Sequence, residues 1–411
     1  MGSGTGPQRP RSTSSLAELQ VCTYLYPWDL IGDPLAVSRL VEGGFEHVCV
    51  AAAYHSVRAA TPQHPQHRFV VAESAALYRP VRPDVWSGCP LKPLGAPWTG
   101  SEDSFGQAVE ALRGNGLGVS AWVVLTHNSA LGRAHRNLAV RNCFGDSYEW
   151  ALCPANAEVR EYAALLAAES VRDLGLEGVS LEACGQLGAE HGGHHDKTPG
   201  AYTPLATLIL SICCCSACQR DWQAHGADAG DALSTLRGAF ETAQHLANRG
   251  DATPQELLGT AMADLFLTAR QLRTEELLEG VLATVGNVEP SLRVTLHAQA
   301  DPWATGASPG LTPGSARCGS AVLVPVEATS PHPADALAAA RRLVAPGVSV
   351  AAYVNLLAPL EPGDFDEHAG RLLNAGADEL HLYHFGLANV SQLGLFSRLA
   401  GRRGDGRADE G

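Results

Sequence analysis

The stretch Leu174 to Lys197 reads LGLEGVSLEACGQLGAEHGGHHDK, and the fold of the chain can be worked out from it. Its short apolar run, residues 178–181, ends in Glu182 and is followed at once by a loop rich in glycine and histidine. Such a run predicts a buried strand. In proteins that alternate strands and helices, the carboxyl ends of the strands carry the chemistry. Glu182 is therefore a candidate catalytic group.

Similar runs recur along the chain, separated by segments with helical periodicity. The predicted strands cover residues 19–26, 47–53, 118–125, 178–182, 292–299, 321–327, 348–355 and 379–384. The predicted helices between and after them include 35–42, 104–113, 156–174, 333–344, 362–374 and 391–399. Eight strands alternating with helices is the count of an α/β (β/α)8 barrel, or TIM barrel.

The rest of the chain is arranged around this barrel. We expect the barrel over residues 16–400, with 184–290 forming a helical elaboration after strand four together with the next barrel helix. Residues 1–15 are polar and rich in Gly, Pro and Ser, which predicts a disordered leader. Residues 401–411 are charged and Gly-rich, which predicts a disordered tail.

The segment 56–100 interrupts the alternation with many prolines and with histidines. A loop of this length is usually either functional or disordered. Because the segment contains aromatic residues such as Tyr78 and Trp86, we favour an ordered lid.

Composition and charge restrict the partners. The chain has 29 basic and 43 acidic residues, a formal charge of −14, and no basic cluster longer than the Arg402-Arg403 pair. This excludes nucleic acid and anionic membranes as expected partners. No apolar stretch is long enough to span a bilayer and residues 1–15 do not read as a secretory signal, so we predict a cytoplasmic protein. The eleven cysteines are odd in number and scattered, unlike a disulfide framework.

Alternation along the strands predicts which side chains line the barrel. In strand four Val179 and Leu181 face the helices, whereas Ser180 and Glu182 face inward. The same alternation on the other strands brings polar groups to one mouth of the barrel. These are His297, Gln299, Glu327, Tyr353, Asn355, His381 and Tyr383.

Two glutamates across a barrel mouth suit the cleavage of a glycosidic bond. One carboxyl stays protonated to assist the leaving oxygen, while the other attacks the anomeric carbon or activates water. Polar and aromatic neighbours would bind the carbohydrate, and no cofactor is expected. Beyond the inward-facing groups already named, the predicted substrate-binding residues are Trp28, Tyr54, His55, His127, His194, His195 and Lys197, with Trp122 and Trp303 as further candidates for stacking on a sugar ring.

At this point the chain resembles the TIM-barrel glycoside hydrolases, specifically the α-galactosidase-like clan, in which the nucleophile follows strand four and the acid/base follows strand six. The resemblance implies that Glu182 is the nucleophile and Glu327 the acid/base. That clan usually has aspartates at both positions, so the longer glutamates depart from its pattern. The segment CCCSACQR, residues 213–220, also looks like the Cys-x-Cys-x-x-Cys element of uncharacterised bacterial glycoside-hydrolase-like barrel proteins.

Several of these residues have a structural alternative. Glu182 could cap a helix or pair with Arg58 or Lys197, and Glu327 could be a loop residue. His297 and His381 could be core histidines whose hydrogen bonds are satisfied inside the barrel, although their position near the strand exits favours the site.

Two segments raise the question of a metal. The run EHGGHHDK, residues 190–197, holds potential ligands, but zinc needs three or four that converge, so we favour a loop in which Lys197 and one histidine contact substrate. The cluster CCCSAC could hold a structural zinc or a disulfide. It lacks the second cysteine pair of a zinc ribbon, so buried free thiols are favoured and no metal is predicted.

Two other functions stay open on this fold. One is a metal-dependent barrel hydrolase or lyase, although such barrels usually carry His-x-His at the end of strand one, where this chain has Tyr24-Leu25-Tyr26-Pro27. The other is a barrel that binds sugar without catalysis.

Overall fold

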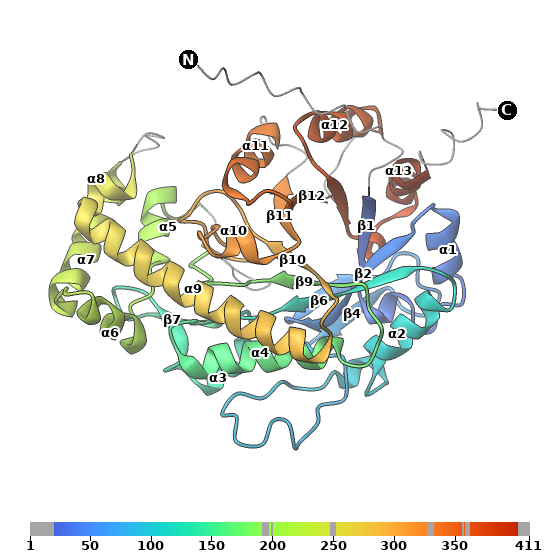
Figure 1. Cartoon of the computed structure of the whole chain (residues 1–411), viewed down its shortest axis with the longest axis horizontal. Coiled ribbons are helices and arrows are strands. Elements are labelled where there is room, and N and C mark those ends of the chain that lie inside the picture. The colour runs from blue at the N-terminus through green and yellow to red at the C-terminus, as the bar shows by residue number, and fades with distance from the viewer. Residues whose placement is uncertain are drawn as a thin grey trace, which may run out of the picture.

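The computed structural model describes residues 20–190, 197–198, 200–246, 252–326, 333–355, 357 and 362–401. Its centre is a closed barrel of parallel strands (Figure 1). The barrel strands are β1 (Gln20–Leu25), β2 (His47–Tyr54), β6 (Gly118–Val124), β9 (Gly178–Glu182), β10 (Arg293–His297), β11 (Ala321–Val326), β12 (Ser349–Asn355) and β13 (Glu379–Tyr383). The ring closes because β1 pairs in parallel with both β13 and β2.

The predicted (β/α)8 barrel is confirmed, and the order of the strands follows the chain. Each predicted strand is present with ends that differ by at most two residues. The reason lies in burial: β9 is buried along its whole length, and β2 is buried from its second residue on. Strands covered on both faces have continuous apolar sequences, which can be recognised without knowing their partners.

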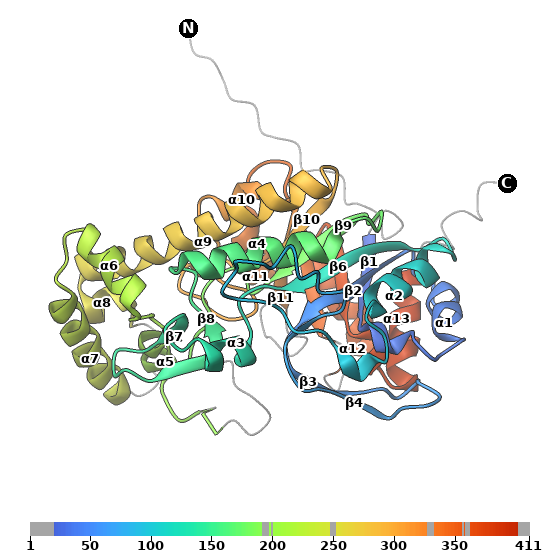
Figure 2. The same ribbon diagram turned by 90° about the horizontal axis from the view of Figure 1, so that it is seen from below.

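Helices surround the barrel on the outside (Figures 1 and 2). They are α1 (Ala36–Glu42), α2 (Ser104–Arg113), α4 (Ala157–Val171), α9 (Thr260–Val288), α11 (Pro333–Leu343), α12 (Pro362–Asn374) and α13 (Val390–Gly401). Local sequence signals set their starts. For example, the Asp103 carboxylate accepts a hydrogen bond from the Gly106 N–H at the first turn of α2, as an N-cap residue does.

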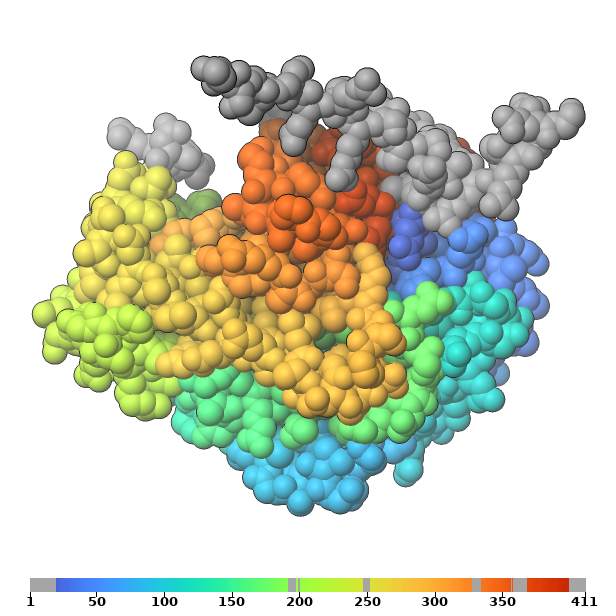
Figure 3. All heavy atoms as spheres, in the orientation of Figure 1, coloured from blue at the N-terminus to red at the C-terminus, as the bar shows by residue number. Residues whose placement is uncertain are grey.

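A group of helices between β9 and α9 forms a lobe beside the barrel, at the left of Figures 1 and 3. Its members are α5 (Pro204–Leu210), α6 (Ser216–Ala224), α7 (Ala229–His245) and α8 (Pro254–Leu258). Thr203 caps α5 just before Pro204, and Thr253 with Glu256 forms a capping box at α8. The lobe has its own hydrophobic cluster, in which the Trp222 and Phe266 rings meet edge to face at 4.9 Å.

The segment 56–100 is ordered, as its aromatic residues predict. It forms the hairpin β3 (Val57–Ala60) and β4 (Phe69–Ala72), and the short β5 (Ala76–Leu77) pairs antiparallel with β2. Tyr78 and Trp86 are both buried. Arg82 attaches the segment to α4 through two hydrogen bonds to Glu169, at 2.7 and 2.6 Å. Its role as a lid stays a prediction.

Shorter elements connect the barrel strands and helices. These are α3 (Ser129–Ala134), the hairpin β7 (Ala139–Arg141) and β8 (Ser147–Leu152), and α10 (Ser315–Cys318). The predicted leader, residues 1–15, and all but the first residue of the predicted tail, 401–411, lie outside the described residues. None of the described helices is long and apolar enough to cross a membrane.

Candidate active site

Glu182 is the last residue of β9, and its carboxylate is held by the neighbouring strand. The indole N–H of Trp122, on β6, donates a hydrogen bond to Glu182 Oε2 at 2.8 Å. Only 6% of the residue is exposed. Burial raises the pKa of Glu182 to about 7, although the indole hydrogen bond acts in the opposite direction. Near neutral pH such a carboxyl can hold a proton and give it up, which is the requirement for a general acid.

Aromatic rings pack around Trp122, the residue that holds this carboxyl. Tyr54 and Trp122 meet at 4.4 Å between ring centroids, and Trp122 and Tyr383 at 6.2 Å. Tyr26 stacks on Trp28 at 4.5 Å, and both are buried. Trp122 therefore differs from the expected sugar-stacking residue: it is 1% exposed, and its indole N–H is used by Glu182.

Two predicted substrate-binding histidines come together at the exits of neighbouring strands. The His55 ring lies 4.3 Å from the ring of His127 and stacks on Tyr54 at 4.1 Å. His55 follows β2, His127 follows β6, and the two strands are paired. Since Tyr54 also contacts Trp122, the histidine pair is connected to Glu182 through two aromatic rings.

His297 and His381 lie in a hydrogen-bond network inside the barrel. His297 Nε2 is 2.9 Å from Ser180 Oγ, which is 3.2 Å from the Tyr24 hydroxyl. That hydroxyl is 3.2 Å from His381 Nδ1, and His381 Nε2 is 3.3 Å from Glu379. Burial lowers the pKa of His297 to about 3, so its ring is neutral. These contacts fit the alternative of satisfied core histidines.

The other predicted site residues are distributed as follows. Tyr353 lies inside the barrel against Tyr24, at 5.4 Å between centroids, and Tyr383 lies against Tyr353 at 5.5 Å. Gln299 Nε2 donates a hydrogen bond to the Ser308 carbonyl, and the exposed Asn355 accepts one from the Leu357 N–H. Lys197 is exposed. Trp303 lies under the Arg270 guanidinium and lines a pocket between α6 and α9, away from Glu182. Glu327, His194 and His195 lie outside the described residues. Arg58, an alternative partner for Glu182, lies over the Phe69 ring.

Sequence reasoning missed two buried groups close to the mouth. Asp29 Oδ2 accepts the Tyr26 N–H at 2.8 Å, and burial raises the pKa of Asp29 to about 7. His384 is fully buried 4.4 Å from the Tyr26 ring, and neither of its ring nitrogens has a hydrogen-bond partner in the described part of the chain. The available signal was their position, since both follow closely on strand ends, Asp29 after β1 and His384 after β13.

Potential metal ligands converge elsewhere. Among the described residues, one group of potential metal ligands lies close enough together to share an ion. It consists of Cys153, Cys213, Cys215 and Cys218. Their sulfur atoms all lie within 4.8 Å of one another. Cys153 supplies the ligand that the CCCSAC segment lacked on sequence grounds. The favoured buried free thiols agree with the structure, in which Cys213, Cys214 and Cys215 are free and buried.

The fold and the site together define a class: a (β/α)8 barrel with a desolvated carboxyl at the exit of its fourth strand. Solved structures of the same fold include an α-L-fucosidase isoenzyme 2 from Paenibacillus thiaminolyticus, at 13% identity and TM-score 0.53, which covers 93% of this chain and 49% of that chain. A β-galactosidase from Bacillus circulans sp. alkalophilus matches at 11% identity and TM-score 0.54, covering 94% of this chain and 56% of that one.

The catalytic domain of a β-amylase from Paenibacillus polymyxa matches at 12% identity and TM-score 0.53, covering 93% of this chain and 98% of that domain. The chain thus spans about half the length of the fucosidase and the galactosidase, and nearly all of the amylase domain. At these identities the likeness establishes a shared fold. No family profile matches the sequence, and no curated protein matches it.

Proposed function

We propose that this protein is a glycoside hydrolase in which Glu182 is a catalytic carboxyl. The observation that carries the proposal is the position of Glu182 at a strand exit, desolvated among aromatic rings, with its pKa raised to about 7. Acid-assisted departure of an alcohol needs a carboxyl that is still protonated at working pH. Barrels of the same fold that are named as a fucosidase, a galactosidase and an amylase give further support.

We assign Glu182 the role of proton donor. The resemblance to the α-galactosidase-like clan implied a nucleophile at this position, but a nucleophilic carboxylate must be ionised, and burial opposes ionisation here. Glu327 is the proposed second carboxyl, because in the sequence it directly follows β11, two strands along from β9. A carbohydrate would meet the aromatic side chains around the mouth before it reached Glu182.

Aryl glycosides with leaving groups of graded acidity test both roles. Glu182→Gln should slow cleavage of substrates with poor leaving groups by about a hundredfold or more and spare those with highly acidic leaving groups, which need no proton. Glu327→Gln should slow all of them. Glu177→Gln is the matched control, because Glu177 is exposed and precedes the amino end of the same strand. Unchanged turnover in both Glu182→Gln and Glu327→Gln would refute the proposal.

A sugar-binding barrel without catalysis is the second candidate. It is favoured by the 6% exposure of Glu182, because a carboxyl so covered is poorly placed to meet a glycosidic oxygen. Calorimetric titration with the products of the aryl glycoside panel separates the two functions. Binding of a monosaccharide to a chain that turns over none of the corresponding aryl glycosides would favour the binding role.

A further inference from the structure

We propose that Cys153, Cys213, Cys215 and Cys218 bind one zinc ion and that this ion fastens the helical lobe to the barrel side of the molecule. The four residues come from two parts of the chain. Cys153 directly follows β8, whereas the other three lie in the turn between α5 and α6 and in the first turn of α6. This site is separate from the proposed catalytic mouth and does not depend on the glycosidase proposal.

The sulfur positions match a tetrahedral ion. Cys153 Sγ lies 3.6 Å from Cys218 Sγ, and Cys215 Sγ lies 3.8 Å from both of them. Zinc–sulfur bonds of about 2.3 Å in a tetrahedron place the sulfurs about 3.8 Å apart. The three distances therefore agree with the edges of a zinc tetrathiolate, and Cys213 completes the set within 4.8 Å.

The three consecutive cysteines in the turn between α5 and α6 point in different directions. Cys213 and Cys215 face Cys153, whereas Cys214 belongs to the hydrophobic cluster of the lobe and its thiol donates to the Ile212 carbonyl at 3.4 Å. Cys218 rejoins the site because it lies three residues further on, in the first turn of α6. The Cys-x-Cys-x-x-Cys spacing therefore aims three sulfurs at one point.

Backbone amides support the thiolate ligands. Cys213 Sγ accepts an N–H from Arg141 at 3.5 Å and another from Cys215 at 3.4 Å. Hydrogen bonds of this kind orient metal ligands and spread their negative charge. Cys153, Cys213 and Cys215 are buried, and Cys218 is partly buried, so water has little access to the sulfurs.

Disulfide pairing explains the cluster less well. A disulfide joins two sulfurs at about 2.05 Å and needs one pair to be singled out. Here three sulfurs are nearly equidistant, and all four cysteines are free in the structure. Zinc binding would displace the thiol protons and use all four sulfurs at once.

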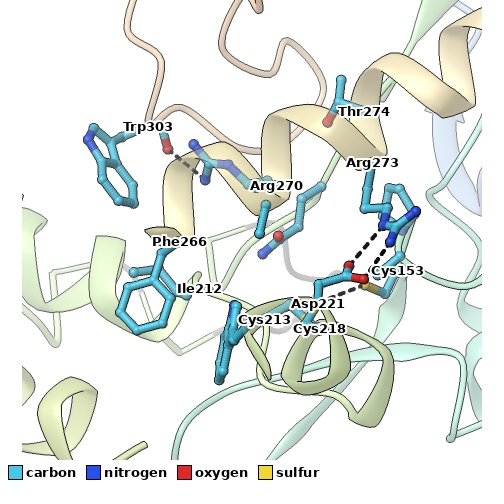
Figure 4. Close-up of a pocket in the computed structure, with 15 residues that line it drawn as sticks. Cys153, Ile212, Cys213, Cys218, Asp221, Phe266, Arg270, Arg273, Thr274 and Trp303 are labelled. Carbon is cyan, nitrogen blue, oxygen red and sulfur yellow. Dashed lines mark hydrogen bonds and ion pairs between the residues drawn. The ribbon is translucent and has the colours of Figure 1, made fainter. Parts of the chain in front are cut away.

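The position of the cluster gives the ion its structural role. Figure 4 shows Arg273 of α9 forming an ion pair with Asp221 of α6, next to Cys218 and Cys153. The α6 helix is thus attached to α9 by the ion pair and, through the zinc, to the end of β8. The backbone of His127, a residue near the proposed active site, forms an isolated antiparallel β-bridge with Ala151 of β8. The ion therefore also stabilises the β7–β8 hairpin beside that histidine.

Metal analysis of the purified full chain is the first test. We expect one equivalent of zinc per chain, and X-ray absorption at the zinc edge should report four sulfur neighbours at about 2.3 Å. A chain free of zinc after expression in zinc-supplemented medium, a chain carrying iron instead, or a zinc ion bound mainly by nitrogen or oxygen would overturn the proposal. These measurements need no variant, so they stand even if a substituted chain fails to fold.

Two cysteine variants provide the matched comparison. Cys215→Ser should lower the zinc content at least tenfold, whereas Cys214→Ser, one residue away but outside the cluster, should retain one equivalent. Equal zinc in both variants would refute the assignment. Intact-mass measurement under non-reducing conditions provides an independent readout: a mass lower by two hydrogens for each pair of cysteines would reveal disulfides and also overturn the proposal.

Discussion

At the scale of single residues, the unusual feature is a carboxyl placed where its charged form is disfavoured. Within the described part of the chain, Trp122 is the side chain that donates a hydrogen bond to Glu182 and offsets the loss of water around it. Ordinary glutamates ionise at about 4.5, so folding penalises the charge of this residue at neutral pH. The penalty is a property of the folded state and can be measured without a substrate.

The pH dependence of stability follows from this shift. The pKa of Glu182 in the folded state lies above its value in the unfolded chain. The contribution of Glu182 to the stability of the fold is therefore fully retained below about pH 4.5 and is lost as pH rises through about 7. Glu182→Gln cannot ionise and should be more stable than the wild-type chain at pH 8, by on the order of 2–3 kcal/mol, with no such gain at pH 4.5. Urea unfolding at the two pH values measures the difference. Glu110→Gln, an exposed glutamate on α2, should show none.

Trp122→Phe tests the hydrogen bond itself. Without the indole N–H the charged form of Glu182 loses its donor, so the pKa of Glu182 should rise further. The smaller ring should lower the stability at every pH. Because the pKa of Glu182 is higher in this variant, the loss of stability with rising pH should continue to values above pH 7. A stability profile parallel to that of the wild type would contradict the assigned role of Trp122.

The sequence predicts the direction of the side chains that line the barrel better than their depth. Strand alternation gives the direction of a side chain, so Glu182 and Tyr383 were correctly directed into the barrel. It does not give depth, and His297 and His381, which point the same way, are bound within the interior network. Cys153 was missed because its partner Cys215 is 62 residues away, beyond the reach of any local spacing pattern.

At the scale of elements, close packing of backbones decides which positions tolerate substitution. Gly132 lies in α3, where that helix packs on β8, and a Cβ at this position would overlap the Glu149 carbonyl oxygen. A backbone oxygen cannot move aside as a flexible side chain can. The sequence predicted the strands and most helices of the barrel from their burial patterns, but this approach of α3 to β8 has no signature in local sequence.

Alanine substitution at two helical glycines should therefore have opposite effects. Gly132→Ala should destabilise the chain by about 1–3 kcal/mol because α3 must move away from β8. Gly238→Ala, in α7, meets nothing within 4 Å and should stabilise by about 0.5–1 kcal/mol through lower backbone entropy in the unfolded chain. Thermal unfolding of both variants measures this. The same sign of change at both sites would contradict the packing argument.

We predict that the attachment of the 56–100 segment to α4 depends on Arg82. Burial raises the pKa of Glu169, but the ion pairs with Arg82 and Arg172 outweigh this and lower it. Arg82→Met should cost about 1–2 kcal/mol, since Glu169 stays buried with one partner and the arginine is partly screened by water. Limited proteolysis should cut 56–100 faster in this variant. Lys92→Met, at an exposed position of the same segment, is the control and should leave cleavage unchanged.

At the scale of the whole molecule, two hydrophobic clusters share one long helix. The helix α9 contributes Phe266 to the cluster of the lobe, and Leu277 and Val281 to that of the barrel. Its 29 residues span about 43 Å at 1.5 Å per residue. Figure 1 shows α9 running from the lobe along α4 beside the barrel. The Arg273–Asp221 ion pair and the hydrogen bond from Arg237 of α7 to the Cys143 carbonyl also join the two parts, and the proposed zinc would add a further link.

Removal of the proposed zinc should loosen the lobe before the barrel. We expect chelator treatment to lower the first unfolding transition by several degrees and to increase amide exchange in α5, α6 and α7 more than in the barrel strands. Hydrogen-exchange mass spectrometry with and without chelator measures this. Uniform loss of protection across barrel and lobe would indicate that the ion does not act locally.

The closure of the barrel by its first and last strands has a consequence for synthesis. Thr23 Oγ1 donates to the Leu382 carbonyl at 3.0 Å across 359 residues of sequence, so β1 emerges from the ribosome long before its partner β13 exists. Throughout that interval one edge of β1 has no partner and is open to pairing with another nascent chain. Translation that stops before residue 379 would leave that edge permanently open, which makes early termination a direct route to aggregation.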